Sequence, residues 1–321
     1  MRYVSTLDRL SDSVSKVDDE FLLAVINGLS GDEKSLPCRY FYDARGSELF
    51  EEITGLPEYY PTRTEAAILS ECAPEIARSF ANDDSLVEFG SGSSRKTEIL
   101  LDLLPDSVGY VAIDVSDAAL VQAKERLGLR YAKRTLRSIV ADFSELGVLP
   151  RAIANGRAVG FFPGSTIGNF APRQASRLLA HFKRLLGPGG RLIIGVDLKK
   201  DVATLVNAYD DADGITAAFN LNVLSRINRE LAGTFDTTAF SHCALYNEDQ
   251  GRIEMHLVSE RAQDVAVAGR IFHFTEGETI HTENSYKYSV SEFRALAAAA
   301  GWTAGRVWTD RNELFSVHEL T

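Results

Sequence analysis

The stretch LVEFGSGSSRKTEILLDLLP, residues 86–105, joins an apolar run to an amphipathic run through a turn of glycine and serine. The apolar run has the composition of a buried strand, and the run after the turn has the spacing of a helix. A glycine turn of this kind presents backbone N–H groups and a helix N-terminus to a ligand, at the carboxyl ends of the strands. The stretch therefore predicts a nucleotide-like ligand at the first turn of an α/β sheet.

Short apolar runs alternate with helical patterns on either side of this turn. The runs are SLVEFG (85–90), VGYVAIDVS (108–116), LRSIVADF (136–143), AVGFFPGS (158–165) and RLIIGVDL (191–198). The clearest helix is predicted over 174–186, where apolar side chains recur with a 3.6-residue period before a Gly-Pro-Gly-Gly stop. Such alternation predicts a parallel sheet with helices on both faces, which is a Rossmann-like α/β fold.

Two regions fall outside this alternation, residues 1–60 and 199–285. The end of the chain, 286–321, reads as a helix and two strands that return to the sheet as an antiparallel hairpin at its edge. We therefore expect a ligand-binding domain formed by 61–198 and 286–321, an inserted substrate-binding domain at 199–285, and an N-terminal helical segment, 1–60, that contributes to the substrate pocket. Near the first boundary, Thr62 and Glu65 have the spacing of a capping box ahead of a helix.

Composition excludes several classes of protein. The chain has 321 residues with a net charge of -11 and no long basic run, which disfavours a nucleic-acid partner. No signal peptide or spanning segment is evident, so we expect no membrane association. The three cysteines lie far apart without a zinc-like spacing, which favours a cytoplasmic protein without a bound metal.

The glycine turn departs from the fingerprint of NAD-binding proteins. Arg95 stands where GxGxxG would place its third glycine, which weakens the dinucleotide interpretation. Acidic residues instead end the next two strands. Asp114 suits the two hydroxyls of a ribose, and Asp142 followed by Phe143 suits an adenine amino group and ring.

Taken in order, these features resemble the class I S-adenosylmethionine-dependent methyltransferases. Glu88 completes an E-x-G-x-G pattern with Gly90 and Gly92, and Lys96 in the first helical turn is explained by a ligand carboxylate. The alternatives are a plain strand-helix turn, a helix cap at Asp114 and a solvated lysine at position 96. An NAD-dependent oxidoreductase and a binding protein without activity also stay open.

A closer resemblance covers nearly the whole chain. The matching segments are residues 40–69, 161–170 (FFPGSTIGNF), 208–231, 252–257 (RIEMHL) and 282–288 (TENSYKY). They are similar to the histidine-specific Nα-methyltransferases of ergothioneine biosynthesis. The resemblance implies that S-adenosylmethionine methylates L-histidine successively to its trimethyl betaine, hercynine, and leaves as S-adenosylhomocysteine.

The resemblance also assigns the residues that contact the substrate. Asn169 and Tyr209 match the residues at the α-carboxylate end, and Tyr59, Glu283 and Ser285 match the imidazole pocket. A carboxylate facing one ring nitrogen and a hydroxyl facing the other satisfy an imidazole in either its neutral or its protonated form. The remaining matches are an apolar wall at Met255, room for close approach at Gly164, and aromatic side chains near the amine at Tyr42 and Phe50.

Within this reading Tyr42 is a hypothetical proton relay for the amine, and the neighbouring rings suit a quaternary ammonium product. Each assignment has a purely structural alternative. Tyr59 can pack a helix entry, Met255 can be core, and the segment with Glu283 and Ser285 can be a solvated strand end. Relatives that methylate tryptophan-derived amines share the fold, so an aromatic amino acid other than histidine is the alternative substrate. We expect a monomer.

Overall fold

The computed structural model describes residues 19–92, 94–149 and 156–321. These divide into two compact units. Unit 1 contains the described residues up to Glu58, together with Ala203–Asn247 and Ile253–Asn284. Unit 2 contains the described residues of Tyr59–Val202, Glu248–Arg252 and Ser285–Thr321.

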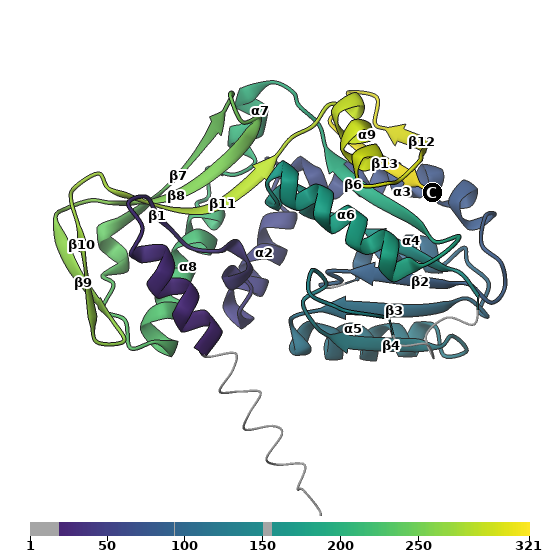
Figure 1. Ribbon diagram of the computed structural model, residues 1–321, viewed down its shortest axis with the longest axis horizontal. Helices are drawn as coiled ribbons and strands as arrows, with labels where there is room; N and C mark the ends of the chain where they lie inside the picture. The colour runs from purple at the N-terminus through teal and green to yellow at the C-terminus, as the bar shows by residue number, and fades with distance from the viewer. Residues whose placement is uncertain (1–18, 93, 150–155) are drawn as a thin grey trace, which may run out of the picture. The chain divides into compact units, whose positions relative to one another are not determined.

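Unit 2 is built on a seven-stranded sheet (Figure 1). Its strands lie in the order β12 (Ala304–Thr309), β13 (Phe315–Leu320), β6 (Arg191–Asp197), β5 (Ala158–Phe162), β2 (Ser85–Phe89), β3 (Gly109–Asp114) and β4 (Leu136–Val140). The five strands from β6 to β4 are parallel, and β13 and β12 add an antiparallel hairpin at the edge. The predicted alternation and the returning hairpin are both confirmed.

Helices cover both faces of this sheet, as the alternation predicted. They are α3 (Tyr60–Ala77), α4 (Arg95–Leu101), α5 (Asp117–Arg130), α6 (Pro172–Leu186) and α9 (Val290–Ala299). Val87 and Phe89 of β2 share one apolar cluster with α6 and α9, whereas Leu86 shares another with α3, α4 and α5. Successive strand residues thus serve opposite faces. In the described part of the chain, none of the helices is both long and apolar enough to cross a membrane.

Helix α6 shows how closely local sequence sets an element here. Proline at its first turn starts it, and the Ala171 amide donates to the Gln174 side chain at 3.1 Å. Its apolar stripe is buried, and it ends at Gly187, whose φ of 73° is left-handed. In Figure 1, α6 runs across the sheet of unit 2.

The capping box expected at Thr62 and Glu65 is wrong. Helix α3 already begins at Tyr60, with Tyr59 as its N-cap and Pro61 in its first turn, so both residues lie inside the helix. Proline fits the first turn because its missing N–H has no partner there. Glu65 is instead fully buried, on the same helical face as Ile68, Leu69 and Cys72.

Unit 1 carries most of a second, smaller sheet. Its order is β1 (Lys34–Ser35), β11 (Thr279–Tyr286), β8 (Arg252–Ser259) and β7 (Phe240–Asn247), with a separate hairpin of β9 (Gln263–Val267) and β10 (Arg270–Phe274). Residues 19–29 are helical, and α2 (Ala44–Thr54) packs on α8 (Ile215–Glu230). Asp43 caps α2 through the Gly46 amide at 2.7 Å and accepts from Asn222 of α8 at 2.8 Å. One carboxylate thus joins the two helices.

Candidate active site

The glycine turn after β2 brings together three of the predicted cofactor residues. Gly90 and Gly92 have φ of 69° and 46°, in the left-handed region that favours glycine. A Cβ at Gly90 would lie 3.3 Å from the ring of Phe143, so this ring stands directly beside the turn. At Gly92, no atom of the described residues other than its chain neighbours lies within 4 Å of the position a Cβ would take. The turn is therefore open at one glycine and bordered by an aromatic ring at the other.

Asp114 ends β3 and is held by two backbone amides. Its Oδ2 accepts from the Gly92 amide at 2.8 Å, and its Oδ1 accepts from the Ser116 amide at 2.9 Å. A carboxylate has about four acceptor positions, so each oxygen keeps a lone pair for another donor. Asp114 is half-buried. The carboxylate is thus fixed beside the glycine turn with acceptor capacity to spare.

At the end of the next strand, β4, the acidic residue is bonded within its own turn. Asp142 lies just beyond β4, where its Oδ1 accepts from the Ser144 amide at 2.8 Å and the Ser144 hydroxyl at 2.6 Å. Phe143 packs edge-on against Phe162, with the ring centroids 5.3 Å apart. The packing orients this ring beside Gly90, while Asp142 remains half-buried.

Glu88 lies beneath the turn and not in it. Glu88 is only 1% exposed and lies on the face of β2 that packs on α3, α4 and α5. It accepts a hydrogen bond from the Tyr110 hydroxyl, which also lies 2.9 Å from the Ser94 hydroxyl at the start of α4. Burial raises the pKa of Glu88 to about 7, against the lowering effect of its hydrogen-bond donors.

Lys96 is paired with a carboxylate of the protein itself. Its ammonium donates to Glu65 of α3, and the Gly164 amide donates to the same carboxylate at 2.8 and 3.0 Å. A Cβ at Gly195 of β6 would overlap Glu65 Oε1 at 1.9 Å, so only glycine leaves room for this side chain. The lysine therefore needs no ligand carboxylate to explain its position.

The sequence analysis named one member, Ser285, of a buried charged cluster at the end of β6 but did not predict the cluster. This Asp197 cluster consists of Tyr60, Asp197, Lys200, Ser285 and Lys287. Asp197 accepts from Tyr60 at 2.8 Å, from Lys200 at 2.6 Å and from Lys287 at 2.6 Å. Lys287 also donates to the Ser285 hydroxyl at 2.9 Å.

The lysines decide the ionisation of this cluster. Burial alone would raise the pKa of Asp197, but the Lys287 and Lys200 ammonium groups outweigh it and hold the pKa below its usual value. Burial lowers the pKa of Lys200 to about 8, against the opposite effect of Asp197. The carboxylate is thus ionised around neutral pH.

The remaining predicted substrate residues of unit 2 lie near this cluster. The Ser165 hydroxyl, next to Gly164, accepts from the Asp197 amide at 2.9 Å. Asn169 ends the short 3₁₀ helix η2 (Thr166–Asn169), where a Cβ at Gly168 would lie 2.8 Å from the Tyr286 carbonyl and 3.4 Å from Ser285 Oγ. The structure therefore places the segment carrying Asn169 against Ser285. Tyr59 is half-buried at the N-cap of α3.

Unit 1 contains five of the predicted substrate residues: Tyr42, Phe50, Tyr209, Met255 and Glu283. Tyr42 and Phe50 meet edge-on with centroids 5.5 Å apart, and Phe219 of α8 lies within 6.0 Å of both rings. Met255 and Glu283 lie on β8 and β11, and the Met255 carbonyl accepts from Thr282 at 3.0 Å.

Tyr209 also belongs to unit 1. It is buried, and its carbonyl accepts from His242 at 2.8 Å.

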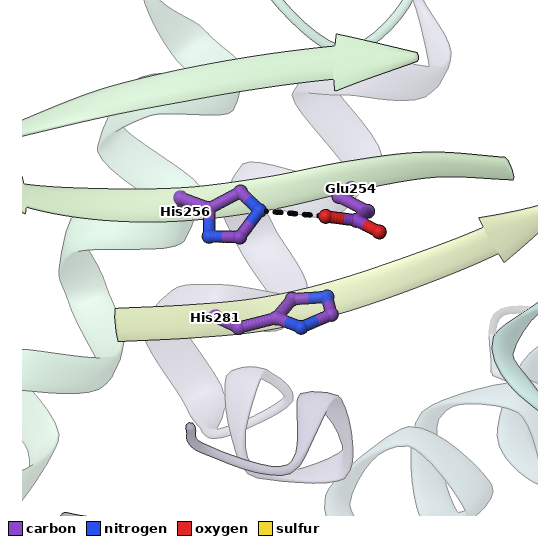
Figure 2. Close-up of side chains that lie close together, drawn as sticks. All are labelled: Glu254, His256 and His281. Atoms are coloured by element: carbon purple, nitrogen blue, oxygen red, sulfur yellow. Dashed lines mark hydrogen bonds and ion pairs between the residues drawn. The ribbon is translucent and has the colours of Figure 1, made fainter. Parts of the chain in front are cut away.

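A histidine-acid group also lies on this sheet. Figure 2 shows Glu254 and His256 on β8 beside His281 on β11, with His256 Nε2 3.0 Å from the Glu254 carboxylate. Ligand atoms of the three side chains lie within 4.8 Å of one another. The two imidazole rings are stacked with centroids 4.7 Å apart and planes at 23°. Because imidazole lone pairs lie in the ring plane, the rings must rotate before both can coordinate one ion.

Comparison with known proteins identifies the family. Residues 21–321 match the family model described as histidine-specific methyltransferase, SAM-dependent. Histidine N-alpha-methyltransferases of Mycolicibacterium smegmatis and Mycobacterium tuberculosis are 45% and 44% identical, over 88% and 89% of this chain and 89% and 90% of those proteins. A 4-dimethylallyltryptophan N-methyltransferase of Claviceps purpurea is 25% identical over 95% of both chains. The chain therefore belongs to the histidine-specific, S-adenosylmethionine-dependent methyltransferase family.

Proposed function

We propose that this enzyme transfers methyl groups from S-adenosylmethionine to the α-amine of L-histidine and forms hercynine, the first step of ergothioneine biosynthesis. The observation that carries the proposal is the family match over 21–321. The hydrogen bond from the Gly92 amide to Asp114 in the glycine turn agrees with it. A monomer acting in the cytoplasm is part of the same proposal.

The residues around the glycine turn fit the methyl donor. Asp114 has acceptor capacity for two ribose hydroxyls, and Phe143 beside Gly90 can cover an adenine whose amino group donates to Asp142. The buried Ser91 hydroxyl in the turn has no partner among the described residues, which suits a ligand atom. Since Glu88 is buried beneath the turn and Lys96 is bonded to Glu65, we assign both a supporting role.

For the substrate, each unit contributes its own residues to the proposal. In unit 2, Asn169 would bind the α-carboxylate, Tyr59 and Ser285 would meet the imidazole ring, and Gly164 would allow close approach. In unit 1, Tyr209 would bind the carboxylate end, Glu283 would accept from a ring N–H, and Met255 would pack on the ring. Amide, phenol and hydroxyl donors bind a carboxylate or a ring nitrogen without adding charge.

The chemistry asks mainly for positioning. A sulfonium methyl is already activated, so the protein has to hold the amine nitrogen in line with it and exclude water. Tyr42 is the proposed relay for the proton that the amine loses before each transfer. The rings of Tyr42, Phe50 and Phe219 offer faces on which a quaternary ammonium is stabilised by about 0.5–2 kcal/mol.

Mass spectrometry of the purified protein with S-adenosylmethionine and each common amino acid tests the proposal. We expect up to three methyl groups on histidine and none on the other amino acids. Methylation of tryptophan but not histidine would leave the fold and the donor in place and refute the substrate. Equilibrium dialysis against S-adenosylmethionine and NADH separates the methyltransferase from an oxidoreductase, and retention of NADH alone would contradict the proposal.

A further inference from the structure

Lys287 is a buried ammonium with two polar neighbours that matter for the substrate. Its side chain is 0% exposed, and it donates to Asp197 Oδ2 at 2.6 Å and to Ser285 Oγ at 2.9 Å. A buried charge is costly unless it is paired and hydrogen-bonded. Asp197, itself 0% exposed, provides the pairing. The second bond connects this ion pair to the hydroxyl proposed to meet the substrate ring.

The bond between Lys287 and Ser285 has only one possible direction. An ammonium group can donate but cannot accept, whereas a hydroxyl has one donor hydrogen and two acceptor lone pairs. Ser285 Oγ is therefore the acceptor, and the Ser285 O–H is directed toward a different acceptor. Ser285 is also 3% exposed and packed beside Gly168, which restricts its side chain.

We propose that Lys287 is a positioning residue that fixes Ser285 as a hydrogen-bond donor, so that the pocket selects a neutral imidazole over an imidazolium or an indole. The inference rests on the proposed function, in which Ser285 faces the ring. Neutral imidazole has one N–H and one acceptor nitrogen, imidazolium has two donors, and indole has one donor and no acceptor nitrogen. Of these three rings, only neutral imidazole offers an acceptor nitrogen to a hydrogen-bond donor at Ser285.

The charged groups around Ser285 are Lys287, Asp197 and Lys200, and the pKa of Lys200, about 8, lies above the unperturbed pKa of an imidazole. Lys287 follows β11, Asp197 ends β6 and is held ionised by Lys287 and Lys200, and Tyr60 belongs to α3. An imidazole has an unperturbed pKa of about 6.5, so the ring of the substrate is the group that changes charge there.

The test compares kcat/KM for histidine between pH 5.5 and 8 in the wild type, Ser285→Ala, Lys287→Met and the double variant. The kcat/KM of each variant is divided by that of the wild type at the same pH. This ratio cancels the titration of the substrate α-amine, which affects every enzyme equally. At pH 8 we expect the wild type to exceed each variant by about tenfold, as for one hydrogen bond. Toward pH 5.5 this advantage should fall by about tenfold. Because Lys287 acts through Ser285, the double variant should match Ser285→Ala alone.

Lys200→Met is the matched control. It removes an ammonium from the same carboxylate, but Lys200 bonds to Asp197 and Tyr60 instead of Ser285. We expect its pH profile to follow the wild type within about threefold. A Lys200→Met profile that matched Lys287→Met would mean that the charge of the cluster matters and not its contact with Ser285, which would overturn the inference.

Three further outcomes are decisive. An active wild type whose advantage over Ser285→Ala does not change with pH overturns this inference and leaves the proposed function standing. The inference is also overturned if the losses of kcat/KM in Lys287→Met and Ser285→Ala multiply in the double variant. A wild type inactive on histidine overturns the proposed function and this inference together. If Lys287→Met does not fold, Lys287→Gln, which keeps an N–H donor, should retain the wild-type profile, and the Ser285→Ala comparison still decides the donor role.

Discussion

Two buried carboxylates in unit 2, Glu88 of β2 and Asp197 of β6, respond to burial in opposite ways. Glu88 is 1% exposed and faces the neutral phenol of Tyr110, and its pKa is raised to about 7. Asp197 is 0% exposed but faces two ammonium groups, and its pKa is lowered. Burial disfavours the charged form in both, so the difference comes from the partners.

The comparison shows what each region can do around neutral pH. The Glu88 carboxyl changes charge there, while the Asp197 carboxylate stays ionised and keeps a fixed arrangement of donors around it. A permanently ionised centre suits the positioning of a hydroxyl such as Ser285. A carboxyl that titrates beneath the glycine turn makes the stability of unit 2 depend on pH.

The largest effect is expected for Asp197→Ala. This change leaves the Lys287 ammonium buried without its counter-ion, and removing one partner of a buried pair typically costs about 3–5 kcal/mol. The free energy of unfolding in urea measures the loss. The control is Arg306→Ala, which breaks an exposed pair with Glu75 and should cost less than about 1 kcal/mol. Equal losses in the two variants would contradict the role given to burial.

Glu88→Gln should change how stability depends on pH. Because the folded state raises the pKa of Glu88 from 4.5 to about 7, it binds the proton more tightly than the unfolded chain. Stability is therefore lost as the pH rises through this range, by about 3 kcal/mol at about 1.4 kcal/mol per pKa unit. Urea unfolding between pH 4.5 and 8 should show this decline in the wild type and not in Glu88→Gln. Parallel curves would refute the raised pKa.

Asp114→Ala tests a carboxylate that, unlike the two buried ones, keeps acceptor capacity for a ligand. We expect it to weaken S-adenosylmethionine binding about 10–100-fold, the loss of one or two hydrogen bonds to a charged group. Calorimetric titration gives the dissociation constant. Asp117→Ala removes an exposed carboxylate from the first turn of α5 and should change binding by less than about twofold. Similar losses in both variants would indicate a general charge effect.

Much of unit 2 could be predicted from sequence because its signals are local. The strand and helix periods, the glycine turn and the acid that ends β3 all lie within short segments, and the sheet brings Gly92 and Asp114 together as expected. The same reasoning assigned no role to Asp197, although it lies within a predicted strand. Its partners Tyr60 and Lys287 are far away in the sequence, and no spacing connects them.

Glu65 shows how a local pattern can mislead. The Thr62–Glu65 spacing resembles a capping box, but the helix begins earlier and Glu65 falls on its buried face. The signal available was its position one turn before Ile68 and Leu69, which places an acid in an apolar stripe. That pattern predicts a buried carboxylate but not its partners, Lys96 and Gly164, which only the tertiary structure supplies.

The smallest effects, from Tyr110→Phe and Tyr60→Phe, sharpen the comparison because each removes one phenol donor from one buried acid. Tyr110→Phe should cost about 1–2 kcal/mol above pH 7 and less at low pH, since its hydroxyl stabilises the ionised form of Glu88. The pKa of Glu88 then rises further, and the loss of stability moves to higher pH. Tyr60→Phe leaves two ammonium groups on Asp197 and should cost about 1 kcal/mol at every pH between 5 and 7, below the pKa of about 8 of Lys200. Urea unfolding of both variants across this range decides the matter: a pH-dependent cost in Tyr60→Phe would mean that the lysines do not keep Asp197 ionised.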